Sequence, residues 1–352
     1  SRAVRSSASP AQPVALRVAD PFCAYDGGMS DPTRTDSAAA ASGDAASAEP
    51  GRLRLMAVHA HPDDETISMG GTLARYAATA SPDTDAIVVT STRGELGEIV
   101  IPERDTPEEH ARLGETRMGE IAAAMAALGV RHFENLGYRD SGMDGDAGND
   151  DPRSFHRHLL TDPDGTVAPL VRLVRSYRPH VIATYDDFGG YGHPDHIAAA
   201  KIARRAWELA ADATWRPDLG AAWSARKLYE VRIPDSVRDK TLALLESRGM
   251  ESWWSEPKEA PPEELEKWRA WRAKMACADD LITTKIDIAA QMPAKRRAIE
   301  AHATQIRRDG PLLALSIDDV IAISPYEQFR LIAHRLDVEP ALPESDLFAG
   351  LR

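Results

Sequence analysis

Residues 53–65, LRLMAVHAHPDDE, join an apolar run to a cluster of charged side chains. Residues 53–58 have the length and composition of a short buried strand. Two histidines and three carboxylates follow within residues 59–65, where burying charge is expensive unless the charge is compensated. Either a metal ion or a catalytic reaction compensates for that cost, or the segment is an ordinary acidic loop.

The chain beyond this stretch repeats the order strand, loop and helix. We expect strands at residues 52–59, 85–94, 131–137, 180–187 and 225–233, and helices at 70–80, 106–130, 167–179 and 193–213. Strands that alternate with helices indicate an α/β fold with a Rossmann-like, mainly parallel sheet and helices on both faces. Ligands bind such sheets at the C-terminal ends of the strands. HPDDE (61–65) and DDFGGYGHPDH (186–196) both fall at such ends.

The two ends of the chain differ from this core. Residues 1–50 are rich in Ser, Ala, Asp and Pro and have no apolar periodicity, so we expect a disordered N-terminal extension. Residues 51–233 would form the Rossmann-like metal-hydrolase core. Residues 234–352 would form a smaller C-terminal α/β cap that completes the substrate pocket. In this cap we expect a strand at 281–288 and helices at 236–249, 261–280, 293–306 and 324–336.

The overall composition excludes several classes of partner. The chain has 42 Lys and Arg against 55 Asp and Glu, a net charge of −13, which argues against binding of nucleic acid or an anionic membrane. Cys23 and Cys277 form no disulfide framework. No apolar run approaches the roughly 18 residues of a membrane span. We therefore expect a soluble cytoplasmic protein with a small-molecule substrate, compatible with a homo-oligomer.

The first charged cluster is His61-Pro-Asp-Asp64. Pro62 disfavours a helical conformation at His61, so the imidazole stays at the strand terminus. Two consecutive carboxylates cannot both face one point, so one of Asp63 and Asp64 can bind a cation while the other stays free beside it. Metal-assisted hydrolysis needs this division, with one acid as ligand and one as base.

The second cluster is His193-Pro-Asp-His196. If Pro194 opens a helix, the two histidines share roughly one face, so one can bind a cation while the other reaches toward the substrate. Two histidines and one carboxylate with an open position are typical of zinc hydrolases, although non-haem iron uses the same set. An isolated His-Pro-Asp is usually a turn, but two acid-and-histidine clusters at strand ends seldom arise by chance. The residues alone therefore predict a metal hydrolase, with Zn²⁺ as the first candidate and Fe²⁺ as the alternative.

Two further histidines have weaker cases for function. His59 would point opposite to its neighbours in the strand, and we expect a structural residue satisfied by a hydrogen bond. His302, in EAHATQI (300–306), is ambiguous, because a histidine on a helix face is more often structural than functional.

The quoted motifs resemble those of a known family, the PIG-L/LmbE-like zinc-dependent N-deacetylases. AVHAHPDDE (57–65) and YGHPDH (191–196) match its two signatures. LGYRDSGM (136–143), TYDDFGGYGHPDH (184–196), EAHATQI and DLFAGL (346–351) resemble its actinobacterial branch. That branch contains the mycothiol-biosynthesis deacetylase, which acts on N-acetylglucosaminyl-inositol, and the mycothiol S-conjugate amidase. The resemblance covers residues 52–350 and is weakest between 233 and 290.

The resemblance implies the metal ligands and the base. His61, Asp64 and His196 would be the zinc ligands. Asp63 would be the general base, which takes a proton from the attacking water and passes it to the departing amine.

The resemblance also implies roles for five other residues. His193 would polarise the amide carbonyl and stabilise the oxyanion, and Asp195 would orient that histidine. Tyr191, in a glycine-rich loop, would add an oxyanion contact. Arg117 and Asp140 match positions that bind the sugar or inositol hydroxyls.

Within the branch, the sequence favours the deacetylase. RDSGM and GGYGHPDH resemble it, and Ser68 stands where the amidase pattern has a lysine, although the terminal DLFAG resembles the amidase. The expected reaction is hydrolysis of the N-acetyl group of an amino-sugar glycoside such as N-acetylglucosaminyl-inositol, releasing acetate and a free amine. The alternatives are the conjugate amidase and a natural-product sugar N-deacetylase.

Two other classes of protein fit less well. A Rossmann-type nucleotide-binding protein would need a glycine-rich turn after the first strand, whereas the carboxylates of HAHPDDE would repel phosphate. A catalytically dead binding module is disfavoured by the intact motifs.

Overall fold

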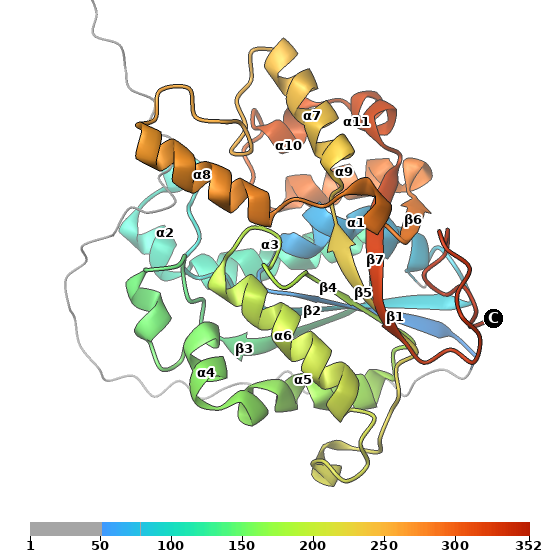
Figure 1. Cartoon of the computed structure of the whole chain (residues 1–352). Helices are drawn as coiled ribbons and strands as arrows, with labels where there is room; N and C mark the ends of the chain where they lie inside the picture. The colour runs from blue at the N-terminus through green and yellow to red at the C-terminus, as the bar shows by residue number, and fades with distance from the viewer. Residues whose placement is uncertain (1–50, 78) are drawn as a thin grey trace, which may run out of the picture.

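The computed structural model describes residues 51–77 and 79–352, so the extension predicted at residues 1–50 lies outside the described residues. Within them, the central element is a seven-stranded sheet in the order β3-β2-β1-β4-β5-β7-β6 (Figure 1). Its strands are β1 (Leu53–His59), β2 (Thr84–Thr92), β3 (His132–Tyr138), β4 (Val181–Thr184), β5 (Lys227–Arg232), β6 (Thr284–Asp287) and β7 (Tyr326–His334). Five predicted strands are confirmed as β1 to β5, and the mainly parallel α/β fold is confirmed with them.

Strand β1 lies at the centre of the sheet, between β2 and β4, and is parallel to both. Leu53 pairs with Thr84, and Leu55 with Val181. In the sheet, β2 and β3 lie successively on one side of β1, whereas β4, the next strand in the chain, lies on the other side. This reversal creates a topological switch point, where a crevice opens at the C-terminal ends of β1 and β4.

Helices cover both faces of the sheet, as Figure 1 shows: α4, α5 and α6 lie on one side, and α1, α3 and α9 on the other. Side chains of β1 alternate between two cores: Met56 and Val58 pack with the first group of helices, and Leu55 and Ala57 with the second. The helices are α1 (Asp64–Tyr76), α2 (Pro107–Ala111), α3 (Leu113–Leu128), α4 (Phe155–Thr161), α5 (Pro163–Tyr177), α6 (Pro194–Leu209), α7 (Asp235–Ser247), α8 (Pro262–Lys274), α9 (Met292–Ala301), α10 (Pro311–Ala314) and α11 (Ile317–Ile323). None of those in the described chain has the length and apolarity needed to cross a membrane.

One predicted helix is split into two. Residues 106–130 form α2 and α3, which are separated at Arg112 by a non-helical backbone (φ −116°, ψ 10°). The predicted helix at 167–179 begins earlier, at Pro163, where Asp162 caps it by accepting the N–H of Gly165 at 2.9 Å.

The last third of the chain contributes to the same sheet. The helix predicted at 324–336 is wrong: Tyr326–His334 forms β7, which pairs antiparallel with β5, while β6 pairs antiparallel with β7. The segment contains good helix formers, but the open edge of β5 offers backbone groups that a strand can satisfy, and tertiary pairing overrides propensity. The boundary placed after residue 233 therefore falls within a continuous sheet. The division into core and cap stays a prediction.

A buried ion pair fastens the C-terminal segment to β5. Lys227 Nζ lies 2.7 Å from Glu344 Oε1, and both side chains are at most 1% exposed. Tyr229 also donates its hydroxyl proton to Glu344. If only one partner of a buried ion pair is replaced, the other charge stays buried without compensation, and the folded state is strongly destabilised.

We predict that Lys227→Met lowers the free energy of unfolding by about 3–5 kcal/mol. Urea denaturation followed by circular dichroism measures this loss. The control is Arg153→Met, which breaks the pair of Arg153 with Asp151, because the Arg153 side chain is 74% exposed and its removal should change stability by less than about 1 kcal/mol. Equal stability of the two variants would contradict the prediction.

Candidate active site

The turn after β1 separates two adjacent carboxylates. Asp63 precedes α1 and has φ 129° and ψ −33°, a conformation that L-residues rarely adopt and that costs about 1–3 kcal/mol. Asp64, the first residue of α1, turns its carboxylate back to accept the N–H of His61 at 2.8 Å. Asp63 instead meets the guanidinium of Arg117 at 3.2 Å. The two acids therefore have different partners, and Asp63, the acid expected to stay free, is paired with Arg117.

Three atoms from the two motifs converge on one point. His61 Nδ1 lies 3.5 Å from Asp64 Oδ2 and 3.2 Å from His196 Nε2, and the last two atoms are 3.3 Å apart. Ligands that surround zinc tetrahedrally at the usual bond lengths would be about 3.3–3.4 Å apart. The triad formed by His61, Asp64 and His196 thus has the spacing of a metal site, although 135 residues separate the histidines.

The opposite ring nitrogens of both histidines are directed at acceptors. His61 Nε2 lies 3.3 Å from Asp195 Oδ2, and His196 Nδ1 lies 3.0 Å from the carbonyl oxygen of Gly189. With the ring protons donated there, the lone pairs of His61 Nδ1 and His196 Nε2 point at the space they share with Asp64. The residues present therefore fit a divalent cation.

The acid groups of this turn have different proton affinities. Burial acts to raise the pKa of Asp64, but the imidazoles of His196 and His61 outweigh it and hold that pKa well below its ordinary value. Burial raises the pKa of Asp63 to about 6, although the Arg117 guanidinium acts against it. Asp64 is thus suited to be an anionic ligand, and Asp63 to be a proton acceptor near neutral pH.

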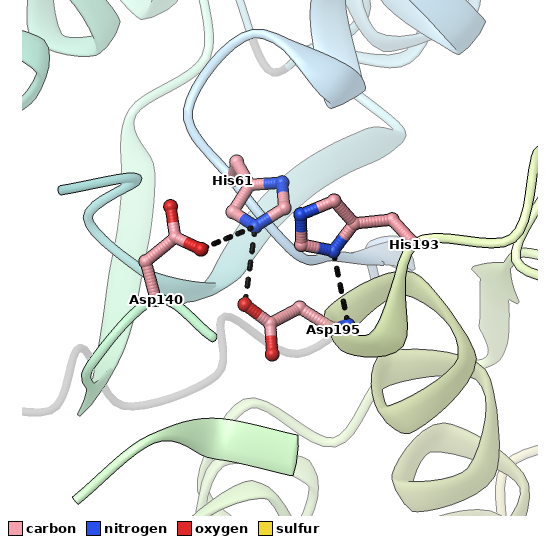
Figure 2. Close-up of side chains that lie close together, drawn as sticks. All are labelled: His61, Asp140, His193 and Asp195. Carbon is pink, nitrogen blue, oxygen red and sulfur yellow. Dashed lines mark hydrogen bonds and ion pairs between the residues drawn. The ribbon is translucent and has the colours of Figure 1, made fainter. Parts of the chain in front are cut away.

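A second group of potential ligands shares His61 (Figure 2). His61 Nε2 faces Asp195 and, at 3.7 Å, Asp140 Oδ1, and His193 lies beside the same ring. Backbone donors of the neighbouring loop already bind these carboxylates: Asp195 Oδ2 accepts the N–H of Ser141, and Asp140 Oδ1 that of Gly142, both at 2.9 Å. Asp64 Oδ2 likewise accepts a backbone N–H, that of His61, so the two groups differ mainly in spacing: the triad's ligand atoms are 3.2–3.5 Å apart, whereas Asp140 Oδ1 lies 3.7 Å from His61 Nε2. On this ground the triad is the better candidate for the metal. Asp195 is the hydrogen-bond partner of His61 Nε2, and Asp140 lies near the same nitrogen at 3.7 Å.

The contact predicted between Asp195 and His193 is made by a different atom. The backbone N–H of Asp195 donates to His193 Nδ1 at 3.1 Å, while its carboxylate contacts His61. Burial, together with His61 and His196, lowers the pKa of His193 to about 3, so its ring is neutral near pH 7. With Nδ1 accepting, the ring proton is on Nε2, from which His193 can donate to a substrate oxygen.

The loop after β4 places Tyr191 beside the triad. Its hydroxyl lies 3.4 Å from His196 Nε2, and Trp271 Nε1 donates to its carbonyl oxygen at 2.6 Å. The loop needs glycine at residue 189, where φ is +66° and a Cβ would stand 2.5 Å from that of His196.

Arg117 and Asp140, the predicted substrate contacts, lie at the centre of the site. Arg117 is 3% exposed and donates to the carbonyl oxygens of Pro62 at 2.7 Å and Gly94 at 3.0 Å as well as to Asp63. Asp140 accepts the N–H of Leu96 at 3.2 Å. Both side chains therefore organise the site.

His59 and His302 differ from each other. The hydrogen bond expected for His59 is wrong: neither ring nitrogen has a partner among the described residues. Burial lowers the pKa of His59, and the neutral ring lies edge-on to Tyr185, 5.1 Å between centroids. His302 is also fully buried, but it lies 3.4 Å from the carboxylate of Glu65.

Sequence reasoning missed three residues that support the site. Tyr185 stacks on His196, with ring centroids 4.4 Å apart, and its hydroxyl accepts the N–H of Ala60 at 3.0 Å. Ser141 binds Asp195 through its backbone and its hydroxyl, and Glu65 accepts the N–H of Asp63 at 3.1 Å. All three lie within or beside the quoted motifs, and that position was the available signal.

Known proteins and one family model resemble this chain in sequence. The PIG-L family model, described as GlcNAc-PI de-N-acetylase, matches residues 56–207, which contain both motifs. A protein of Geodermatophilus obscurus named 1D-myo-inositol 2-acetamido-2-deoxy-alpha-D-glucopyranoside deacetylase is 43% identical over 304 residues, covering 85% of this chain and 98% of that protein. A protein of the same name from Streptomyces avermitilis is 41% identical over 313 residues, covering 85% and 97%.

Solved structures share the fold at low identity. N,N′-diacetylchitobiose deacetylase from Pyrococcus horikoshii aligns with a TM-score of 0.52 at 17% identity, over 79% of this chain and 83% of that one. The 4-carboxy-2-hydroxymuconate hydratase from Pseudomonas putida aligns with a TM-score of 0.52 at 18% identity, over 82% and 100%. Because these two names describe different reactions, this likeness shows the fold alone. Because the two named relatives above 40% identity each cover 85% of this chain, the chain belongs to the PIG-L family of amide-cleaving de-N-acetylases.

Proposed function

We propose that this protein is a zinc-dependent deacetylase that hydrolyses the acetamide of N-acetylglucosaminyl-inositol to acetate and the free amine. The observation that carries the proposal is the convergence of His61, Asp64 and His196 on one point with the carboxylate of Asp63 beside them. The names of the relatives above 40% identity support the choice of substrate.

The proposed chemistry divides between the metal ligands and the base. Zinc held by the triad would lower the pKa of a coordinated water to about 7 and polarise the amide carbonyl. Asp63 would accept the proton of the attacking water and pass it to the departing nitrogen, while Arg117 keeps the carboxylate in place.

Two further side chains would respond to charge on the substrate oxygen. His193, neutral and with its proton on Nε2, would donate to that oxygen as it becomes negative in the transition state. Tyr191 would add a second donor from the loop after β4. Arg117 and Asp140 remain proposed contacts of the sugar or inositol hydroxyls.

Replacing the base should separate catalysis from metal binding. We predict that Asp63→Asn lowers kcat by about 10²–10⁴-fold, because an amide cannot accept the proton, and leaves one equivalent of metal bound. Amine release and metal analysis of the same preparation measure the two effects. Asp187→Asn is the control, since the Asp187 side chain is 92% exposed and should leave kcat unchanged. Turnover of Asp63→Asn within about tenfold of wild type would contradict the assigned role.

Metal removal should abolish activity reversibly. Dialysis against a chelator should remove amine release, and one equivalent of Zn²⁺ should restore it in the wild type. In His196→Ala the triad has lost one of three ligands, so we predict much weaker zinc binding and no recovery at that concentration. The exposed His110 gives the control variant His110→Ala, which should behave as wild type. Stoichiometric zinc in His196→Ala would rule out the ligand assignment.

A substrate panel tests the proposed specificity. We predict the highest kcat/KM for N-acetylglucosaminyl-inositol, a lower value for N-acetylglucosamine because it lacks the inositol contacts, and little cleavage of a mycothiol S-conjugate. Fluorescent labelling of the released amine measures all three. Faster cleavage of the conjugate would contradict the deacetylase assignment and favour the amidase. Activity on N-acetylglucosamine alone would indicate that the natural substrate is another amino sugar.

A further inference from the structure

A histidine from the last third of the chain contacts the turn that carries the proposed base. His302 Nε2 lies 3.4 Å from Glu65 Oε1 and 3.5 Å from Thr66 Oγ1. His302, Glu65 and Thr66 are all fully buried. The other ring nitrogen, His302 Nδ1, has no hydrogen-bond partner among the described residues. Every polar contact of this imidazole within them is thus directed at the turn.

Glu65 transmits this contact to Asp63. One carboxylate oxygen, Oε1, faces His302 and accepts the Thr66 hydroxyl proton at 2.6 Å, while Oε2 accepts the backbone N–H of Asp63 at 3.1 Å. Asp63 has the positive φ of 129° described above, a conformation that persists only where the surroundings impose it. A fixed Glu65 carboxylate is one of the groups that impose it.

The position of His302 is itself fixed by α3. The backbone N–H and the hydroxyl of Thr304 donate to the two carboxylate oxygens of Glu120, both at 2.8 Å, and the N–H of Val100 donates to the carbonyl oxygen of Thr304 at 2.9 Å. Glu120 lies one turn beyond Arg117 on the same helix. Helix α3 therefore supports Asp63 from two sides. Arg117 on this helix contacts the Asp63 carboxylate, and His302, anchored to the helix near Thr304, contacts the Asp63 backbone through Glu65.

We propose that His302 is a positioning residue for the general base, acting through Glu65 to keep the Asp63 carboxylate turned away from Asp64. The inference rests on the proposed function of Asp63. It adds to the active site a residue that lies 236 positions after Thr66 in the chain. Without the imidazole, the Glu65 carboxylate loses its contact with His302, and its hydrogen bond with the Asp63 N–H weakens. Asp63 can then relax to negative φ, which turns its carboxylate away from the attacking water. The metal ligands keep their own partners, Asp195 for His61 and Gly189 for His196.

The test compares His302→Leu with His302→Gln. Leucine removes the donor, and we expect kcat to fall about 100-fold, as a misplaced catalytic group does, with KM within about twofold and one equivalent of zinc retained. Glutamine can present an N–H near the place of Nε2, so it should recover most of the lost kcat. A kcat for His302→Leu within about threefold of wild type, or loss of zinc in parallel with kcat, would overturn the proposal.

Hydrogen exchange supplies a readout that does not depend on turnover. The Asp63 amide, measured by mass spectrometry on zinc-loaded protein, should exchange faster in His302→Leu than in the wild type and be restored in His302→Gln. Equal exchange in all three proteins would overturn the positioning role. An inactive wild type would instead count against the proposed function, because exchange and zinc content are measured without substrate.

Two more variants separate this role from general stability. Glu344→Gln weakens a buried ion pair with Lys227 outside the site, so it should lower stability and leave kcat unchanged; an equal loss of kcat would overturn a specific role for His302. Thr66→Val is a mild replacement that serves if His302→Leu does not fold. It removes the hydroxyl that binds Glu65 Oε1 and should lower kcat several-fold with zinc retained, whereas an unchanged kcat would contradict the proposal.

Discussion

Parallel pairing of β1 with β4 is the constraint on which the site depends. It brings His61 and Asp64, at the end of one strand, within 3.5 Å of His196, at the start of the helix that follows the other. Four carboxylates, those of Asp63, Asp64, Asp140 and Asp195, gather around these histidines, with Arg117 as the nearby cation. Such an excess of buried negative charge is stable only when it is paired, and a divalent cation in the triad would balance it.

Orientation in this site comes from hydrogen bonds outside the triad. Asp195 and the carbonyl of Gly189 set which nitrogen of each histidine faces inward, and Ser141 in turn fixes Asp195. Residues far along the chain complete the arrangement: Trp271 binds the loop that carries Tyr191, and residues 302–304 bind the turn after β1 and helix α3. The last third of the chain therefore supports the site as well as the sheet.

Much of this could be predicted from the sequence because its signals were local. Apolar runs bounded by turns gave β1 to β5, and two short motifs at strand ends indicated a metal-hydrolase site. Which of their residues would be the ligands and which the base came from the resemblance to the family, and those roles stay predictions. The failures involve distant partners. β7 has helix-forming residues and becomes a strand because β5 has an open edge. For His59 a hydrogen bond was expected, yet neither ring nitrogen has a partner among the described residues, and the ring lies edge-on to Tyr185. For Asp195, the resemblance to the family implied His193 as the partner; its backbone N–H does meet His193 Nδ1, but its carboxylate lies against His61.

The proposed binding of a metal ion through His61 Nδ1 can be tested directly by locating the ion. Crystals of the zinc-loaded protein, measured above and below the zinc absorption edge, would locate the ion by its anomalous signal. We predict one peak between His61 Nδ1, Asp64 Oδ2 and His196 Nε2, with bonds of about 2.0–2.2 Å. A peak on the opposite side of the ring, between His61 Nε2, Asp140 and Asp195, would contradict it.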